Sequence, residues 1–214
     1  MCGLSDDRFT AAVAAIDAAN ADDPTTVTVR TSTHTSTRTS THTSTHTSTG
    51  PLARVHGQLA AEWVRRLDPA ADDTVVLAAR AHHLRRWELP RTSYPEGRAG
   101  YLRWRRDQKR RHADDVEGIL RSAGYADDEI ARVQALVRRE GLGTDPDTQL
   151  VEDAACLVFV ETQLADVADR LDRDHLIEVI RKTSRKMSPA ALDAVATLDL
   201  GDVERELLAA AFDS

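Results

Sequence analysis

The chain has 214 residues, of which 41% are apolar and 29% are charged, and its net charge is −7. These values are ordinary for a globular protein with a proper core, and no apolar run approaches the roughly 18 residues that a membrane-spanning helix needs. Cys2 and Cys156 are too few for a disulfide framework. The N-terminal MCGLSDDRF lacks the pattern of a secretory signal, so we expect a cytoplasmic protein.

Apolar residues at helical spacing predict helices along most of the chain. Phe9, Val13 and Ile16 form one face of the first helix, and glycines at 124 and 141 mark helix ends further on. No alternating apolar pattern competes with these helices, so the predicted class is all-α. The predicted helices cover residues 6–21, 52–67, 72–87, 98–123, 127–139, 147–171, 174–187, 189–198 and 202–212.

A low-complexity tract interrupts this pattern near the N-terminus. Thr31 to Thr49 reads TSTHTSTRTSTHTSTHTST, a tandem four-residue repeat without an apolar residue. Such a segment buries nothing that would offset the ordering of the chain, so we expect a disordered insertion. The predicted organisation is a lead-in with one helix (1–30), the insertion (31–50) and a helical domain (51–214), whose core is 52–165 and whose C-terminal helices cover 174–212.

The stretch from Ala78 to His112 is strongly basic within this acidic protein. It holds eleven Arg or Lys residues against three Asp or Glu residues, which indicates a site for an anionic ligand, most often a phosphate. Pro90 and Pro95 bound an irregular segment here. Flanking guanidinium groups could clamp a phosphate or carboxylate while aromatic rings stack on a base. The predicted substrate-binding residues are Arg86, Arg91, Tyr94, Arg98 and Tyr101.

Most other charges of this stretch are expected to solvate a helix surface. Arg103, Arg106 and Arg110 fall on one face of the helix over 98–123, and Lys186 with its basic neighbours is interpreted in the same way. Nucleic-acid binding is the main competing use of the positive charge. The overall acidic charge and the lack of a glycine-rich RNA motif or zinc finger argue against it. The predicted partner is therefore a small phosphorylated or anionic ligand.

Four polar residues occupy apolar stripes on separate predicted helices. One such buried residue is most often a hydrogen-bonded part of the core. Four that converge could hold a divalent metal with an open position for water. Both interpretations are open, because the sequence does not give the distances between side chains on different helices. The four residues are His56, His83, His112 and Asp153.

The order of these elements resembles the HD-domain metal-dependent phosphohydrolase superfamily over roughly residues 52–165. His56 matches the early histidine, AARAHHL the segment with the His-Asp pair, and His112, ahead of ADDVEGILRSAGY, a further histidine. Asp153 in LVEDAACLVFVE matches the late aspartate. The resemblance implies an HD-domain-like helical bundle. Two departures argue against two metals: His82-His83 replaces the His-Asp pair, and VRREGL stands where another histidine is expected.

A closer resemblance covers nearly the whole chain. RAHHLRRWELPRTSYPEGRAGYLRWR, LVEDAACLVFVE and IRKTSRKMSP are similar to the family catalogued as domain of unknown function 4202. That family has Gln-His where this chain has His82-His83, which favours His83 as the functional position, and it lacks the Thr/Ser/His tract. Some members carry a glutamyl-tRNA synthetase label. The tripeptide at 186–188 is too little to support it, since no other motif of those enzymes is present.

These observations predict a metal-dependent phosphohydrolase that acts on a phosphate ester or nucleotide, without an organic cofactor. His56, His83, His112 and Asp153 would hold a divalent metal that lowers the pKa of its water. Glu152 or His82 would act as the general base. The alternative is a non-catalytic HD-like bundle that binds an anionic metabolite or an RNA end through its arginines. In a third interpretation the polar cluster is structural and needs no ligand.

Overall fold

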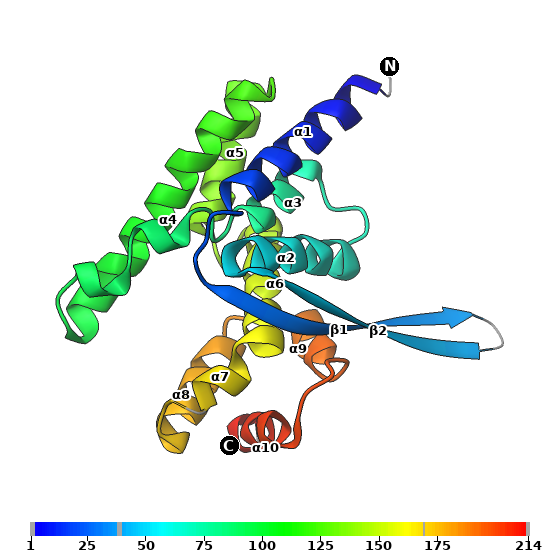
Figure 1. Cartoon of the computed structure of the whole chain (residues 1–214), viewed down its shortest axis with the longest axis vertical. Coiled ribbons are helices and arrows are strands. Elements are labelled where there is room, and N and C mark those ends of the chain that lie inside the picture. The colour runs from blue at the N-terminus through cyan, green and yellow to red at the C-terminus, as the bar shows by residue number, and fades with distance from the viewer. Residues whose placement is uncertain (1–2, 38–39, 169, 213–214) are drawn as a thin grey trace.

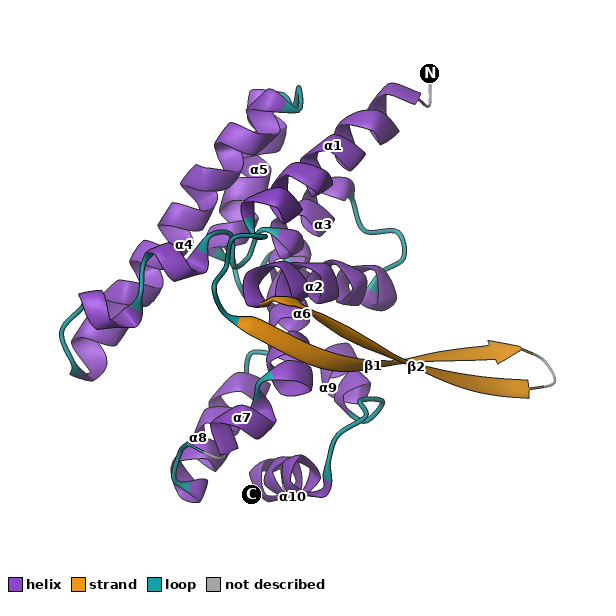
Figure 2. Cartoon of the chain, viewed as in Figure 1, coloured by secondary structure: helices purple, strands orange, loops and turns teal. Residues whose placement is uncertain are grey.

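The computed structural model describes residues 3–37, 40–168 and 170–212. Helices dominate these residues, which confirms the all-α class (Figure 2). No helix in the described ranges is both long and apolar enough to cross a membrane. The helices are α1 (Gly3–Ala19), α2 (Leu52–Leu67), α3 (Asp73–Arg80), α4 (Gly97–Ser122), α5 (Asp127–Arg138), α6 (Pro146–Thr162), α7 (Leu164–Ala168), α8 (Arg173–Ser184), α9 (Pro189–Val195) and α10 (Asp202–Phe212), with short 3₁₀ turns at Arg86–Glu88 and Arg91–Ser93.

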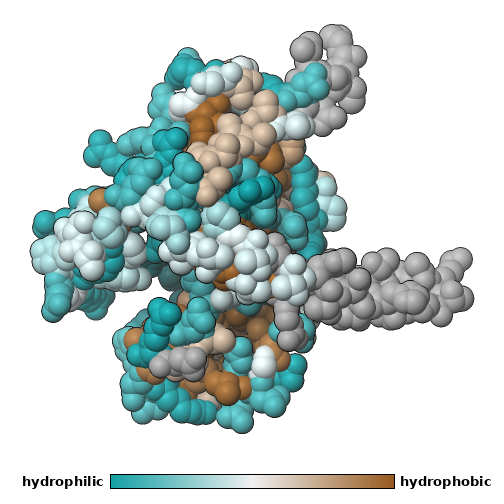
Figure 3. Space-filling view, viewed as in Figure 1, coloured by the Kyte–Doolittle hydropathy of each residue, from teal (hydrophilic) through white to brown (hydrophobic). Residues whose placement is uncertain are grey.

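Helix α6 is the centre of the arrangement (Figure 1). It packs against α2, α3, α5, α7 and α9, and its buried face includes Val151, Ala154 and Leu157. Helices α4 and α5 form an antiparallel pair on one side, and α8 and α10 pack together at the opposite end. Most of the face seen in Figure 3 is hydrophilic, and hydrophobic groups reach it over α1 and the C-terminal helices.

A two-stranded antiparallel hairpin stands where the sequence predicts a disordered insertion. Strands β1 (Thr26–Thr37) and β2 (Ser40–Pro51) pair in register from Thr26 opposite Pro51 to Thr37 opposite Ser40. Strand pairing satisfies the backbone N–H and C=O groups that face the partner strand, and the outward-facing groups of each edge strand are left to water. β-branched threonine also favours extended backbone. Val29, at the base of β1 just before the repeat, is buried in the hydrophobic core. The hairpin is therefore anchored to the helices at its base.

Two predicted helices end at least seven residues earlier than the sequence indicates. The helix predicted over 72–87 stops at Arg80, and residues 81–85 form a turn. Arg85 adopts a left-handed backbone with φ 49°, and its N–H donates to Asn20 Oδ1. The helix predicted over 147–171 breaks after Thr162, whose hydroxyl donates to the Val158 carbonyl, a local hydrogen bond that competes with the helical one. The first break places His82 and His83 on a turn.

The end of α3 is fixed by two close contacts. Arg80 donates two hydrogen bonds to Asp17 of α1, at 2.8 and 2.6 Å. The backbone of α2 also approaches α3 closely at Gly57, where an added Cβ would lie 2.4 Å from the Arg80 carbonyl oxygen. Because backbone cannot move aside as a side chain can, this crossing requires glycine.

We expect Gly57→Ala to lower the free energy of unfolding by about 1–3 kcal/mol, the usual cost of overpacking. Gly118→Ala is the matched control: Gly118 lies in α4, and outside the local backbone of that helix and the adjacent residues no atom of the described chain lies within 4 Å of its added Cβ. Alanine there should raise the free energy of unfolding by about 0.5–1 kcal/mol through helix propensity. Denaturant unfolding of both variants measures the difference. Equal effects at the two sites would contradict the close crossing of α2 and α3.

Candidate functional site

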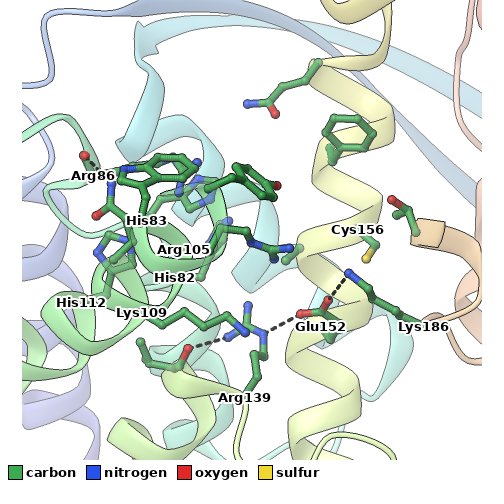
Figure 4. Close-up of a pocket in the computed structure, with 18 of the residues that line it drawn as sticks. His82, His83, Arg86, Arg105, Lys109, His112, Arg139, Glu152, Cys156 and Lys186 are labelled. Carbon is green, nitrogen blue, oxygen red and sulfur yellow. Dashed lines mark hydrogen bonds and ion pairs between the residues drawn. The ribbon is translucent and has the colours of Figure 1, made fainter. Parts of the chain in front are cut away.

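Helices α4, α6 and α8 and the turn after α3 enclose a cavity of about 450 Å³ (Figure 4). A pocket of this size suits a small molecule. Among the described residues that line it, five side chains are cationic and only Glu152 is a carboxylate. The cations are Arg86, Arg105, Lys109, Arg139 and Lys186, and the aromatic rings are those of Tyr101, Trp104 and Phe159.

One stripe of α4 supplies much of this lining. Tyr101, Arg105, Gln108 and His112 follow one another at three- and four-residue spacing and all line the cavity, as residues on one helix face do. The opposite face carries the exposed arginines at 103, 106 and 110, so the prediction that these charges solvate the helix is confirmed. The helical period of α4 therefore separates the basic residues that line the cavity from those that face solvent.

Glu152 is held by two of the cations. Its carboxylate accepts a hydrogen bond from Arg139 Nε at 2.9 Å and lies 3.9 Å from Lys186 Nζ. Burial raises the pKa of Glu152, but the charges of Arg139, Lys109 and Lys186 outweigh it, so the pKa is lowered. The side chains of Arg139 and Glu152 are only 7% and 10% exposed. Glu152 therefore anchors neighbouring cations as a carboxylate rather than standing free as a base.

Two of the cavity histidines have tautomers fixed by backbone carbonyls. His82 Nδ1 lies 2.7 Å from the Ala79 oxygen, and His112 Nδ1 lies 2.6 Å from the Leu84 oxygen. A carbonyl only accepts, so each Nδ1 must carry the proton. The lone pair of each neutral ring is then on Nε2.

His83 also carries its proton on Nδ1, and a chain of hydrogen bonds through Thr162 and His56 determines this. The Thr162 hydroxyl donates to the Val158 carbonyl, so it must accept from His56 Nε2 at 3.0 Å. His56 Nδ1 is then an acceptor, and it lies 3.5 Å from His83 Nδ1, which leaves the lone pair of His83 on its Nε2. Both ring nitrogens of His56 are thus engaged inside the protein.

All four rings are neutral at pH 7. Burial, followed by the charge of Arg86, lowers the pKa of His56 to about 4 and that of His112 to about 3. Burial also holds the pKa of His82 and that of His83 well below the ordinary value, with further contributions from neighbouring positive groups. The cavity therefore presents imidazole lone pairs beside permanent cations.

The four residues predicted as metal ligands are not assembled into one set. His83 and His112 line the cavity, with ring centroids 6.4 Å apart, while His56 lies behind His83. Asp153 accepts from the Ser188 N–H and from the Gln149 amide, both at 2.9 Å. Across residues 3–37, 40–168 and 170–212, no group of three or more His, Cys, Asp or Glu side chains is placed to hold a metal ion.

The predicted substrate-binding residues divide in the same way. Arg86 and Tyr101 line the cavity, and the predicted bases His82 and Glu152 do so too. Arg91 instead donates to the carbonyls of Tyr94 and Pro95, because it closes the loop between the two prolines. The Tyr94 hydroxyl donates to Asp107, and Arg98 is exposed. Arg91, Tyr94 and Arg98 are not among the residues that line this cavity.

A family model described as a domain of unknown function (DUF4202) matches residues 10–208. The chain belongs to this family. The DUF4202 match includes every segment that lines the cavity, but its description names no activity. Neither the curated proteins nor the solved structures contain a match to this chain. What this DUF4202 member does must therefore be inferred from the chemistry of the cavity.

Several cavity residues of this DUF4202 chain were not predicted from its sequence. Lys186 was interpreted as part of a solvated face, yet it lines the cavity because the end of α8 meets α6 beside Glu152. The stripe that continues from Tyr101 through Trp104 and Gln108 to His112 was the available signal for α4. No sequence pattern signals Arg139, which ends α5 with a left-handed φ of 64°. The missed residues include Trp104, Arg105, Gln108, Lys109, Arg139, Phe159 and Lys186.

We expect the protein to lose stability as the pH falls from 7.5 to 5.5. The folded pKa values of the buried histidines lie below the ordinary value of about 6.5, so the unfolded state binds more protons in this window. Their stabilisation is present above about pH 6.5 and is lost below it, by about 1 kcal/mol for each buried histidine at pH 5.5. Denaturant unfolding at the two pH values measures the loss.

His112→Asn should shrink this pH-dependent loss, because asparagine can donate to the Leu84 carbonyl without a titrating ring. His175→Gln is the matched control, because His175 is exposed on α8, and it should leave the loss unchanged. A free energy of unfolding that is the same at pH 7.5 and 5.5 in the unmodified protein would contradict the neutral histidine cluster.

Proposed function

We propose that the protein binds a small phosphorylated ligand in the cavity between α4, α6 and α8. The observation that carries this proposal is the surplus of cations. Within the described ranges, no carboxylate lies within ion-pair distance of Arg86, Arg105 or Lys109. Cations gathered in a concave site with low-dielectric walls attract anions strongly. A phosphate group, which accepts several charge-assisted hydrogen bonds, suits this array.

The aromatic side chains of the cavity offer a surface for the part of the ligand that does not carry the phosphate. The Arg86 guanidinium lies over the Trp104 ring at 4.7 Å, so one face of that ring is already covered. Tyr101 and Phe159 line the cavity as well. A ligand with a compact body and a phosphate group would bury its body against these rings, as small-molecule sites commonly do. A volume of about 450 Å³ also matches a small ligand.

Lys109 is the most informative cation for a test. Burial, followed by the charge of Arg139, lowers its pKa to about 8, so it is largely charged at pH 7 although its surroundings disfavour the charge. A bound anion would relieve that cost. The loss of this side chain should therefore weaken anion binding more than the loss of a solvated cation on the same helix.

We expect Lys109→Met to weaken the binding of phenyl phosphate by about tenfold to a hundredfold, which corresponds to one charge-assisted contact of about 1.5–3 kcal/mol. Arg110→Met is the matched control, since Arg110 is the next residue of α4 and its side chain is 80% exposed. It should change the affinity less than twofold. Titration calorimetry at pH 7 measures both. Equal affinities for the unmodified protein and Lys109→Met would contradict the proposed anion site.

Hydrolysis of a phosphate ester is a second candidate. It follows from the resemblance to the HD-domain superfamily, and one observation favours it: the predicted ligand His112 donates Nδ1–H to the Leu84 carbonyl, as metal-binding histidines commonly do. The predicted ligand set does not fit a metal as the residues lie, because His56 and Asp153 are engaged elsewhere. In this candidate function His82, whose neutral ring keeps a lone pair on Nε2, would be the available general base.

Metal analysis separates the two candidates. If the protein is a metal-dependent hydrolase, the chain purified without chelator should contain close to one equivalent of a divalent transition metal, and His83→Asn should lose it. Release of inorganic phosphate from phenyl phosphate should then depend on that metal. Less than about a tenth of an equivalent, together with phenyl phosphate binding without turnover, leaves the binding function alone.

A further inference from the structure

Two buried acceptor atoms in the cavity are left without a partner. Gln108 Nε2 donates to the carbonyls of Arg86 and Leu89, both at 2.9 Å, so both amide hydrogens are used and Oε1 can only accept. His112 Nδ1 donates to Leu84, so its Nε2 can only accept. Within the described residues, both atoms are buried without a hydrogen-bond partner. Each residue is 2% exposed, and both line the cavity.

These acceptors belong to one side of the cavity. Gln108 and His112 lie one turn apart on α4, and the Nε2 lone pairs of His82 and His83 belong to the same group of rings, with centroids 4.0 Å apart. Figure 4 shows the three histidines together on one side, with Lys109, Arg139, Glu152 and Lys186 in a row away from them. The histidine acceptors thus lie on one side of the cavity together with Arg86, and Lys109, Arg139, Glu152 and Lys186 lie on the other.

A buried acceptor needs either a hydrogen-bond donor or a cation. A cation is disfavoured here, because the neighbouring guanidinium and ammonium groups would repel it and the carboxylate of Glu152 is already paired with Arg139 and Lys186. In the free protein an ordered water can donate hydrogen bonds to these two acceptors. A ligand group without O–H or N–H would displace that water without replacing its hydrogen bonds, and affinity would be lost. The lining therefore selects for O–H or N–H donors.

We propose, building on the anion site above, that the ligand is a phosphate monoester of a polyhydroxylated group, that is, a sugar or polyol phosphate. Its phosphate would bind Arg105 and Lys109, lining cations that have no carboxylate within ion-pair distance in the described ranges. Its hydroxyl groups would donate to Gln108 Oε1 and His112 Nε2. A hydroxyl can donate to one group while it accepts from another, so a polyol suits a site in which acceptors and cations lie close together.

The test compares sorbitol 6-phosphate with hexyl phosphate, which share a six-carbon chain and a phosphate monoester and differ in the hydroxyl groups. We expect sorbitol 6-phosphate to bind the unmodified protein at least tenfold more tightly by titration calorimetry. His112→Asn keeps a donor for the Leu84 carbonyl and removes the Nε2 acceptor. It should weaken sorbitol 6-phosphate by about fivefold to thirtyfold and change hexyl phosphate less than twofold.

The outcomes distinguish this inference from the proposed function. If the two esters bind equally, or if His112→Asn weakens both alike, donor recognition is wrong and the anion site stands. If neither ester nor phenyl phosphate binds, both proposals fail. A titration with Mn²⁺ or Zn²⁺ alone gives the remaining outcome: stoichiometric binding that His112→Asn abolishes would assign the lone pairs to a metal and overturn the donor proposal. Circular dichroism of His112→Asn checks that the variant is folded.

Discussion

The buried ion pair between Arg139 and Glu152 organises the cavity. It joins the end of α5 to the central helix α6, with both side chains almost fully shielded from water. A charge in such a place is costly unless it is paired, and this pair also brings Lys186 within 3.9 Å of the same carboxylate. One carboxylate is therefore committed to two cations. Arg86, Arg105 and Lys109 are left to face whatever enters the cavity.

The same positive field explains the state of the histidines. Charged imidazole would be disfavoured both by burial and by the nearby guanidinium groups, so the rings stay neutral and act as acceptors. Backbone carbonyls then fix which nitrogen holds the proton. Burial is the main reason that the imidazoles offer lone pairs, and the nearby cations reinforce it. At Cys156 burial outweighs the nearby cations, and it raises the pKa of the thiol to about 12.

The sequence was a good guide to the fold and a partial guide to the site. The helical period predicted the class and the exposed face of α4 that carries Arg103, Arg106 and Arg110. It did not predict that Arg105 and Lys109 line the cavity. It could not predict that Asp153 turns toward Ser188, because the direction of a buried carboxylate depends on the neighbouring helix. Nor could it predict that residues 81–85 leave the helix, since Asn20, far away in sequence, holds that turn. Contacts between distant segments decide which polar residues meet.

The hairpin of the Thr/Ser/His repeat leaves and re-enters the helical body at almost one point. Thr26 and Pro51 are paired partners, and the two strands extend away from the helices (Figure 1). A repeat that is added to one strand can be matched by a repeat added to the other without moving α1 or α2. Slippage during replication of a four-residue repeat would thus change the length of a projecting arm and leave the cavity geometry untouched. The protein can carry a tract of unstable length at little cost to its chemistry.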